Sequence, residues 1–177
     1  MASINEAYKK ELNSISTALK KAIGHGYTVK YYGLAYALSN RDGEVAYYTD
    51  VELNKEESIN VTYDDTYDVQ FYFRLESVVA NETQIGAYGR RRNWLNSFLF
   101  SLVLSAKHKN FNQEQLYTRA VYAIQQGGGI ISGAEMNMYE LHKEEFLKDA
   151  FHIETQVIRI VFEIRKILLI NCVNECY

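Results

Sequence analysis

The sequence predicts a single α+β domain in which an antiparallel or mixed sheet of about five strands is packed on one face by helices. Three patterns carry this prediction. Apolar residues recur at three- and four-residue steps over 4–23, and they alternate with polar residues over 67–75 and again over 158–164. A chain of 177 residues fits one domain, and no linker divides it, so we treat 1–177 as one unit.

The first expected element is an amphipathic helix over residues 3–23. Ser3 and Glu6 have the spacing of a capping box, and Gly24 follows as the residue that ends the helix. The apolar stripe that would face the core consists of Ile4, Tyr8, Leu12, Ile15, Leu19 and Ile23.

Four strands are expected next. Residues 27–39 and 44–53 are rich in aromatic and β-branched side chains and flank a turn at 40–43, which predicts a long hairpin. Residues 59–63 follow as a third strand, and 67–76 as a fourth. One face of the fourth strand is apolar, so helices must cover it. That face consists of Tyr67, Val69, Phe71, Phe73 and Leu75.

The second half of the chain is expected to contain two or three further helices. Residues 80–92 lack periodicity and predict a long exposed loop, whereas 93–106 place apolar residues at helical spacing and predict a buried helix. A third helix begins after Asn112 and ends at Gly127. The apolar residues of 93–106 are Trp94, Leu95, Phe98, Leu99, Leu102 and Val103.

The region after this helix has weaker patterns until the last strand. The three glycines at 127–129 predict a flexible break, and 134–150 is permissive for helix. Residues 158–164 alternate with the two-residue period of a half-buried strand. The apolar run 167–170 either extends that strand or belongs to a C-terminal docking tail over 166–177.

Charge and hydropathy narrow the classes of partner. The net charge of −3 and the pI near 5.8 provide no broad positive field, so duplex DNA is not expected as the main ligand. No run of about 20 apolar residues suits a membrane span. The start of the chain is polar where a secretory signal would be apolar, so we expect a protein made in a cytoplasm, without a membrane partner.

The sequence contains no recognisable catalytic, cofactor or metal motif. None of the four histidines pairs with another at helical ligand spacing, and Cys172 and Cys176 lack accompanying histidines, so we expect free thiols and no metal. The three glycines lack the Lys and Ser/Thr of a phosphate-binding loop. We therefore expect no enzyme and no cofactor. An enzyme whose site is assembled from distant residues, including Asp64, Asp65 and Asp68, stays open as a rival.

An excess of tyrosine is the most informative compositional feature. The chain has 15 tyrosines, and tyrosine supplies large contact area together with a polar tip. A basic cluster beside Trp94 is a second candidate, because arginines at a helix start oppose the helix dipole and suggest a partner. The candidate interface residues are Tyr31, Tyr32, Tyr36, Tyr47, Tyr48, Arg90, Arg91 and Arg92.

The order of elements resembles the tail-terminator and tail-completion proteins of tailed bacteriophages, which form rings in the tail or neck. The elements that carry the resemblance are the helix 3–23, the hairpin around 40–43, the strand 67–75, the helix near Trp94 and the strand 158–164. The chain departs from that pattern by the added region 113–152. With no proline among its residues, it is also similar to proteins of AT-rich phages such as the crAss-like group.

This resemblance implies a structural virion protein that forms a homo-oligomeric ring and acts by binding. Its partners would be copies of itself and neighbouring neck, portal or tail proteins, with DNA only as passing cargo. The alternative is a cytoplasmic module that binds a protein or a nucleic-acid single strand through exposed aromatics and the arginines 90–92.

Overall fold

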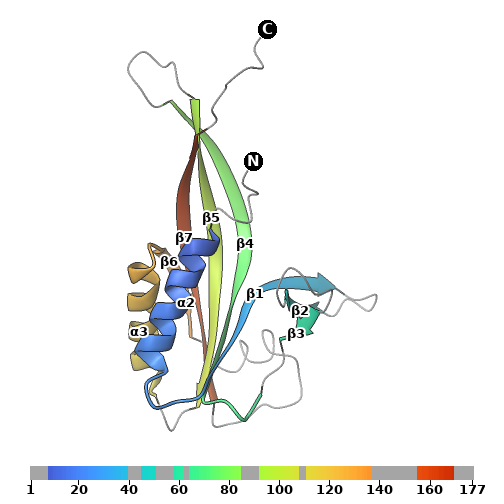
Figure 1. The fold of residues 1–177 in the computed structure, drawn as a ribbon, viewed down its shortest axis with the longest axis vertical. Helices are drawn as coiled ribbons and strands as arrows, with labels where there is room; N and C mark the ends of the chain where they lie inside the picture. The colour runs from blue at the N-terminus through green and yellow to red at the C-terminus, as the bar shows by residue number, and fades with distance from the viewer. Residues whose placement is uncertain are drawn as a thin grey trace.

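A computed structural model of the chain describes residues 8–39, 45–50, 58–61, 64–84, 92–107, 111–136 and 155–169. These residues form an α+β fold with a mixed sheet, as predicted (Figure 1). The described part contains two helices, fewer than the three or four expected. Its elements are α2 (Lys9–Ile23), β1 (Val29–Ser39), β2 (Val45–Asp50), β3 (Ser58–Asn60), β4 (Val69–Gln84), β5 (Arg92–Lys107), α3 (Gln113–Gln126), β6 (Ile130–Glu135) and β7 (Thr155–Leu169).

The seven strands lie in the order β3-β2-β1-β4-β5-β7-β6. β1 and β2 pair antiparallel, which confirms the predicted hairpin, and β1 then pairs parallel with β4. All other neighbours are antiparallel. Three long strands, β4, β5 and β7, form the centre, with Phe73, Leu102 and Ile160 opposite one another across them.

The segment 93–106 is strand β5, so the predicted helix there is wrong. Phe98, Phe100, Leu102 and Leu104 face the helices, and on the other face Ser101, Val103 and Ser105 are also buried. A strand buried on both faces reads as a nearly continuous apolar run instead of an alternation. Such a run also satisfies helical spacing, which explains the error.

Helices α2 and α3 lie side by side over one face of the long strands (Figure 1). The buried stripe of α2 agrees with the predicted one from Leu12 to Ile23, while Ser3 and Glu6 lie outside the described residues. The predicted cap of α3 is confirmed, because the Asn112 side chain accepts a hydrogen bond from the backbone N–H of Gln115 at 2.8 Å. None of the described helices is both long and apolar enough to cross a membrane.

The opposite face of the sheet has its own buried cluster. It consists of Tyr32, Ala35, Val61, Tyr72, Val103 and Val157. Gln70 lies on this face, where its side chain accepts hydrogen bonds from the Tyr32 hydroxyl at 3.1 Å and from the backbone N–H of Asp64 at 2.9 Å. In this part of the sheet, buried residues therefore lie on both faces.

Three further expectations concern the segments between these elements. The expected loop 80–92 is wrong at both ends, because β4 continues to Gln84 and β5 begins at Arg92; residues 85–91 lie outside the described part. Residues 134–135 belong to strand β6, not to a helix, and 137–150 are likewise outside. The late strand is confirmed and reaches Leu169, so 167–169 extends it, and 170–177 is not described.

The glycines 127–129 form a tightly packed turn, not a flexible break. Gly127 ends α3, and its backbone N–H donates to the carbonyl of Ala123 at 3.1 Å. Gly127 and Gly129 are buried, so the turn is part of the core.

Candidate functional site

The central strands project beyond the helices as a three-stranded arm (Figure 1). We define the arm as residues 77–84 of β4, 92–99 of β5 and 163–169 of β7, which are paired with one another along their length. At its base, the Tyr8 ring before α2 packs against the rings of Phe98 and Phe100, each 5.1 Å away between centroids. Above this contact the helices no longer cover the sheet.

Both outer strands of the arm have open edges in the part of the chain that the structure describes. β1 pairs with β4 only over Val69–Arg74, so residues 75–84 have no described strand on that side. β6 pairs with β7 only from Arg159 to Glu163, so residues 164–169 have none on the other side. Unpaired backbone N–H and C=O groups on such edges are available to another strand.

Apolar side chains are exposed along the β4 edge. Val78 is 44% exposed and Val79 is 49% exposed, and as neighbours in a strand they point to opposite faces. Single exposed apolar residues are common on protein surfaces. Two in succession on an open edge are unusual, because natural edge strands are more often protected by charge, proline or a bulge.

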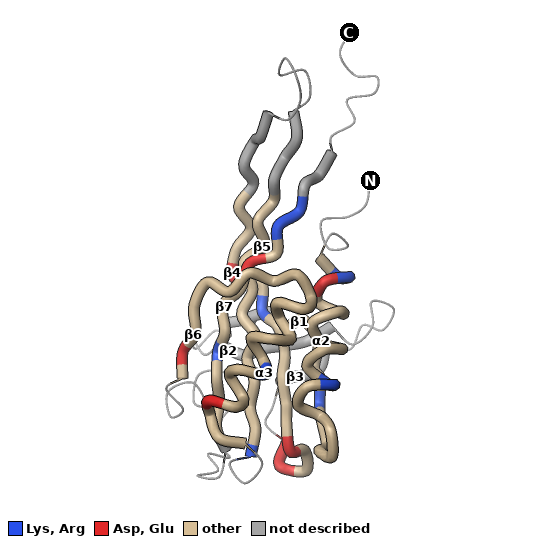
Figure 2. Tube along the Cα trace, turned by 90° about the vertical axis from the view of Figure 1, so that its left-hand side faces the viewer, with Lys and Arg blue, Asp and Glu red and all other residues tan. Residues whose placement is uncertain are grey.

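Charged residues surround the base of the arm (Figure 2). On the β4 side, Glu76 accepts hydrogen bonds from Ser101 and, at 2.7 Å, from Arg74. On the β7 side, Arg165 donates to Glu163 at 2.8 Å. Hydrogen bonds from Arg165 and from Ser97 lower the pKa of Glu163, which keeps that carboxylate ionised. Lys166 pairs with Glu11 of α2 and ties the arm to the helix layer.

The candidate interface tyrosines that the structure describes are used by the fold itself. The Tyr31 ring stacks on Phe71 with 4.8 Å between centroids, and burial raises the pKa of its hydroxyl to about 12. Tyr32 lies on the opposite face and is 9% exposed. These two rings leave little area for a partner.

The remaining candidates lie mostly beyond what the structure describes. Tyr36, Tyr47 and Tyr48 belong to β1 and β2, with Tyr36 opposite Tyr48, but their side chains are outside the described set. Arg90 and Arg91 are outside it as well. Arg92 begins β5 opposite Gln84 and so lies in the arm, far from the hairpin (Figure 1). Among the candidates that the structure describes, Tyr31, Tyr32 and Arg92 do not come together in one site.

Asp64 and Asp68 are held in two separate ion pairs, and Asp65 is exposed. Asp64 accepts a hydrogen bond from the Lys30 ammonium at 2.9 Å, and hydrogen bonds from Thr66 and Lys30 lower its pKa to about 2. Asp68 accepts from the Thr28 hydroxyl at 2.9 Å and lies 3.7 Å from Lys107. A general acid or base works best with a pKa near the operating pH, so Asp64 does not fit that role. Among the described residues, no cluster of three metal-binding side chains occurs.

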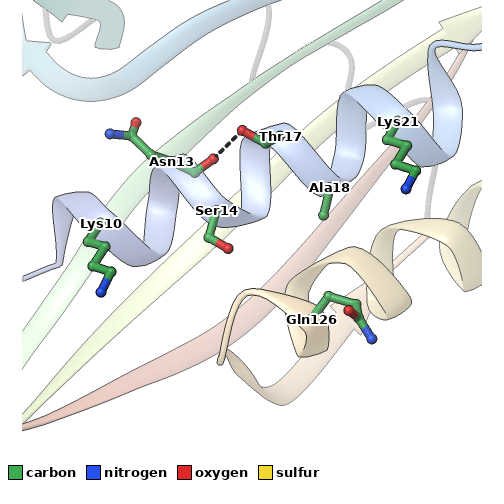
Figure 3. A pocket seen from close by; sticks show the side chains of 7 residues that line it. All are labelled: Lys10, Asn13, Ser14, Thr17, Ala18, Lys21 and Gln126. Carbon is green, nitrogen blue, oxygen red and sulfur yellow. Dashed lines mark hydrogen bonds between the residues drawn. The ribbon is translucent and has the colours of Figure 1, made fainter.

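A shallow groove of about 500 Å³ lies between α2 and the end of α3 (Figure 3). Lys10 and Lys21 stand at its two ends, and Gln126 approaches from α3. Thr17 donates to the carbonyl of Asn13 at 2.8 Å, within the helix. None of the lining residues is aromatic, whereas single-strand binding sites present aromatic rings for base stacking.

Sequence reasoning missed the arm and its exposed edge at Val78 and Val79. The sequence does contain a signal for the longer strand, because residues 77–84 contain no glycine or proline and continue directly from the alternating strand. No protein-family model matches the chain, and no curated protein matches its sequence.

Proposed function

We propose that the protein is a structural subunit that forms a homo-oligomeric ring in the neck or tail of a tailed-phage virion, as a tail terminator or connector. Its mechanism is binding to copies of itself and to adjoining neck, portal or tail proteins, without turnover. The single observation that carries this proposal is the projecting arm, whose two edges are open in the described part of the chain.

A closed ring requires a heterologous interface, in which one surface of a subunit meets a different surface of the next. The arm offers two such surfaces on opposite sides, one from β4 and one from β7. Exposed apolar residues on the β4 edge add area that association would bury. These features support assembly more than they support a pocket that holds a small molecule.

The placement in a phage neck or tail is supported by the order of elements. The first helix, the hairpin, the alternating strand and the late strand of the resemblance are all present among the described elements. The helix near Trp94 is replaced by β5, so the sheet of this chain is larger than the resemblance implies. The acidic net charge suits a ring that lets DNA pass without holding it.

The test is the assembly state of the purified protein, alone and with virion neck fractions. We expect mass photometry to show oligomers of one fixed size, and electron microscopy to show closed rings. If the protein is monomeric at every concentration and joins no particle, the proposal is wrong. If rings form but purified virions lack the chain by mass spectrometry, only the placement in the virion is wrong.

A further inference from the structure

We propose that β7 of one copy pairs in parallel with β4 of the next copy along the arm, so that the arms of a ring form one continuous sheet. This inference rests on the proposed function and names the partner of its site, which is the opposite edge of a second copy of this chain.

The direction of the strands leads to this pairing. β5 runs antiparallel to both β4 and β7, so β4 and β7 run the same way. When identical copies stand side by side with their arms pointing in one direction, the β7 edge of one copy meets the β4 edge of the next, with parallel strands. A two-fold dimer through β4 alone would leave the β7 edge open and would stop at two copies.

The open edges of β4 and β7 also lie at the same level along the arm. Val78 is opposite Phe98, which is opposite Ile164, and Thr83 is opposite Asn93, which is opposite Leu169. The open residues 164–169 of β7 therefore stand level with 78–83 of β4. Below them, β1 and β6 occupy the corresponding edges, so pairing between copies is confined to the arm.

Side chains on the two edges are complementary on one face. Arg165 is opposite Ser97, which is opposite Val79, so Arg165 and Val79 share a face and a height. Glu76 lies on the same face, since it is bonded to Ser101 there. The exposed Arg165 of one copy would therefore cover Val79 of the next with its aliphatic stem, on the face where that copy's Glu76 pairs with Arg74.

The pairing has a consequence for the shape of the ring. Below the arm, β6 of one copy and β1 of the next both stand between β7 and β4, so the bodies must splay apart there. β1 leaves β4 after Ala35, and the hairpin swings away from the long strands (Figure 1). We expect a ring that is narrower at the arms than at the helical bodies.

Disulfide trapping tests the pairing directly. In a chain carrying Cys172→Ser and Cys176→Ser, the double variant Val79→Cys with Arg165→Cys is oxidised mildly and run on a non-reducing gel. We expect a ladder of linked copies up to the ring, because each chain offers both partners. A bond within one chain is excluded by β5, which separates the two positions by two strand spacings, roughly 10 Å.

Three control chains define the alternatives. Val79→Cys alone and Arg165→Cys alone should each give no linked product, and Val79→Cys with Tyr122→Cys should give no ladder, because Tyr122 is an exposed residue of α3. The pair Ser77→Cys with Arg165→Cys tests a register shifted by two residues. Dimers from Val79→Cys alone would show β4–β4 pairing and overturn the proposal.

A charge variant supplies a second readout that needs no cross-link. Val79→Lys places a cation beside the neighbour's Arg165, so we expect it to weaken assembly by at least about tenfold in protein concentration. Tyr122→Lys should leave assembly unchanged. If rings form normally with Val79→Lys and neither cysteine pair gives a ladder, edge pairing is wrong while the ring stands. If no variant and no parent chain assembles, the proposed function is wrong as well.

Discussion

Two glycines allow the turn after α3 to lie close to the neighbouring helix and strand. A Cβ atom at Gly127 would lie 2.2 Å from Cγ1 of Ile15 and 2.9 Å from its backbone nitrogen. At Gly129 it would lie 2.5 Å from Cγ2 of Ile124 and 2.9 Å from the Phe162 ring. The turn between α3 and β6 can therefore pack on α2 and β7 only because these positions lack side chains.

Gly127→Ala is expected to destabilise the fold by about 1 to 3 kcal/mol, since the methyl group forces backbone and side chains apart in a packed core. Urea unfolding followed by circular dichroism measures the loss. The matched control is Gly133→Ala in β6, where a Cβ meets nothing within 4 Å. Equal urea midpoints for the two variants would contradict this expectation, because they would show that the turn accommodates the methyl group without loss of stability.

Asp64 gives the fold a dependence on acid pH. Hydrogen bonds from Thr66 and Lys30 lower its folded pKa to about 2 from 3.8, so its contribution is present above pH 4 and is lost as pH falls toward 2. We expect Asp64→Asn to remove part of this loss, because the amide oxygen still accepts from Thr66 but does not titrate. Urea midpoints at pH 5 and pH 2.5 check this; an identical drop in both proteins would contradict it.

At the scale of elements, local sequence patterns predicted the secondary structure best where a single local signal decides it. The stripe of α2 follows from one buried and one exposed face, and the cap at Asn112 follows from local hydrogen bonding. The alternation of β4 is kept because the buried residues of its second face, Gln70 and Tyr72, carry polar groups. β5 was misread because neighbours cover both of its faces. The open edges of the arm depend on where β1 and β6 stop pairing, and no local pattern records that.

At the scale of the molecule, strand and helix lengths do not match. The 16-residue β4 spans roughly 53 Å at about 3.3 Å per residue, whereas the 15-residue α2 spans roughly 22 Å at about 1.5 Å per residue. The helix layer therefore protects only part of the sheet. The glycine turn fixes the helices to the lower part of the sheet, and the ion pair between Lys166 and Glu11 joins α2 to the base of the arm. The rest of the arm has no described helix over it.

Hydrogen exchange should reveal this division of stability. In dilute protein, we expect amides in β4 residues 77–84 to exchange faster than those in 69–74, because only the lower residues have β1 on their outer side. On assembly, the 77–84 amides should gain protection, since a strand of the next copy then accepts or covers them. β5 serves as the internal standard, because strands flank it on both sides along its length and its amides should change little. Exchange that is equally slow in both halves of β4 before assembly would mean that its arm edge is already covered within one chain, and the surface on which the ring depends would not exist.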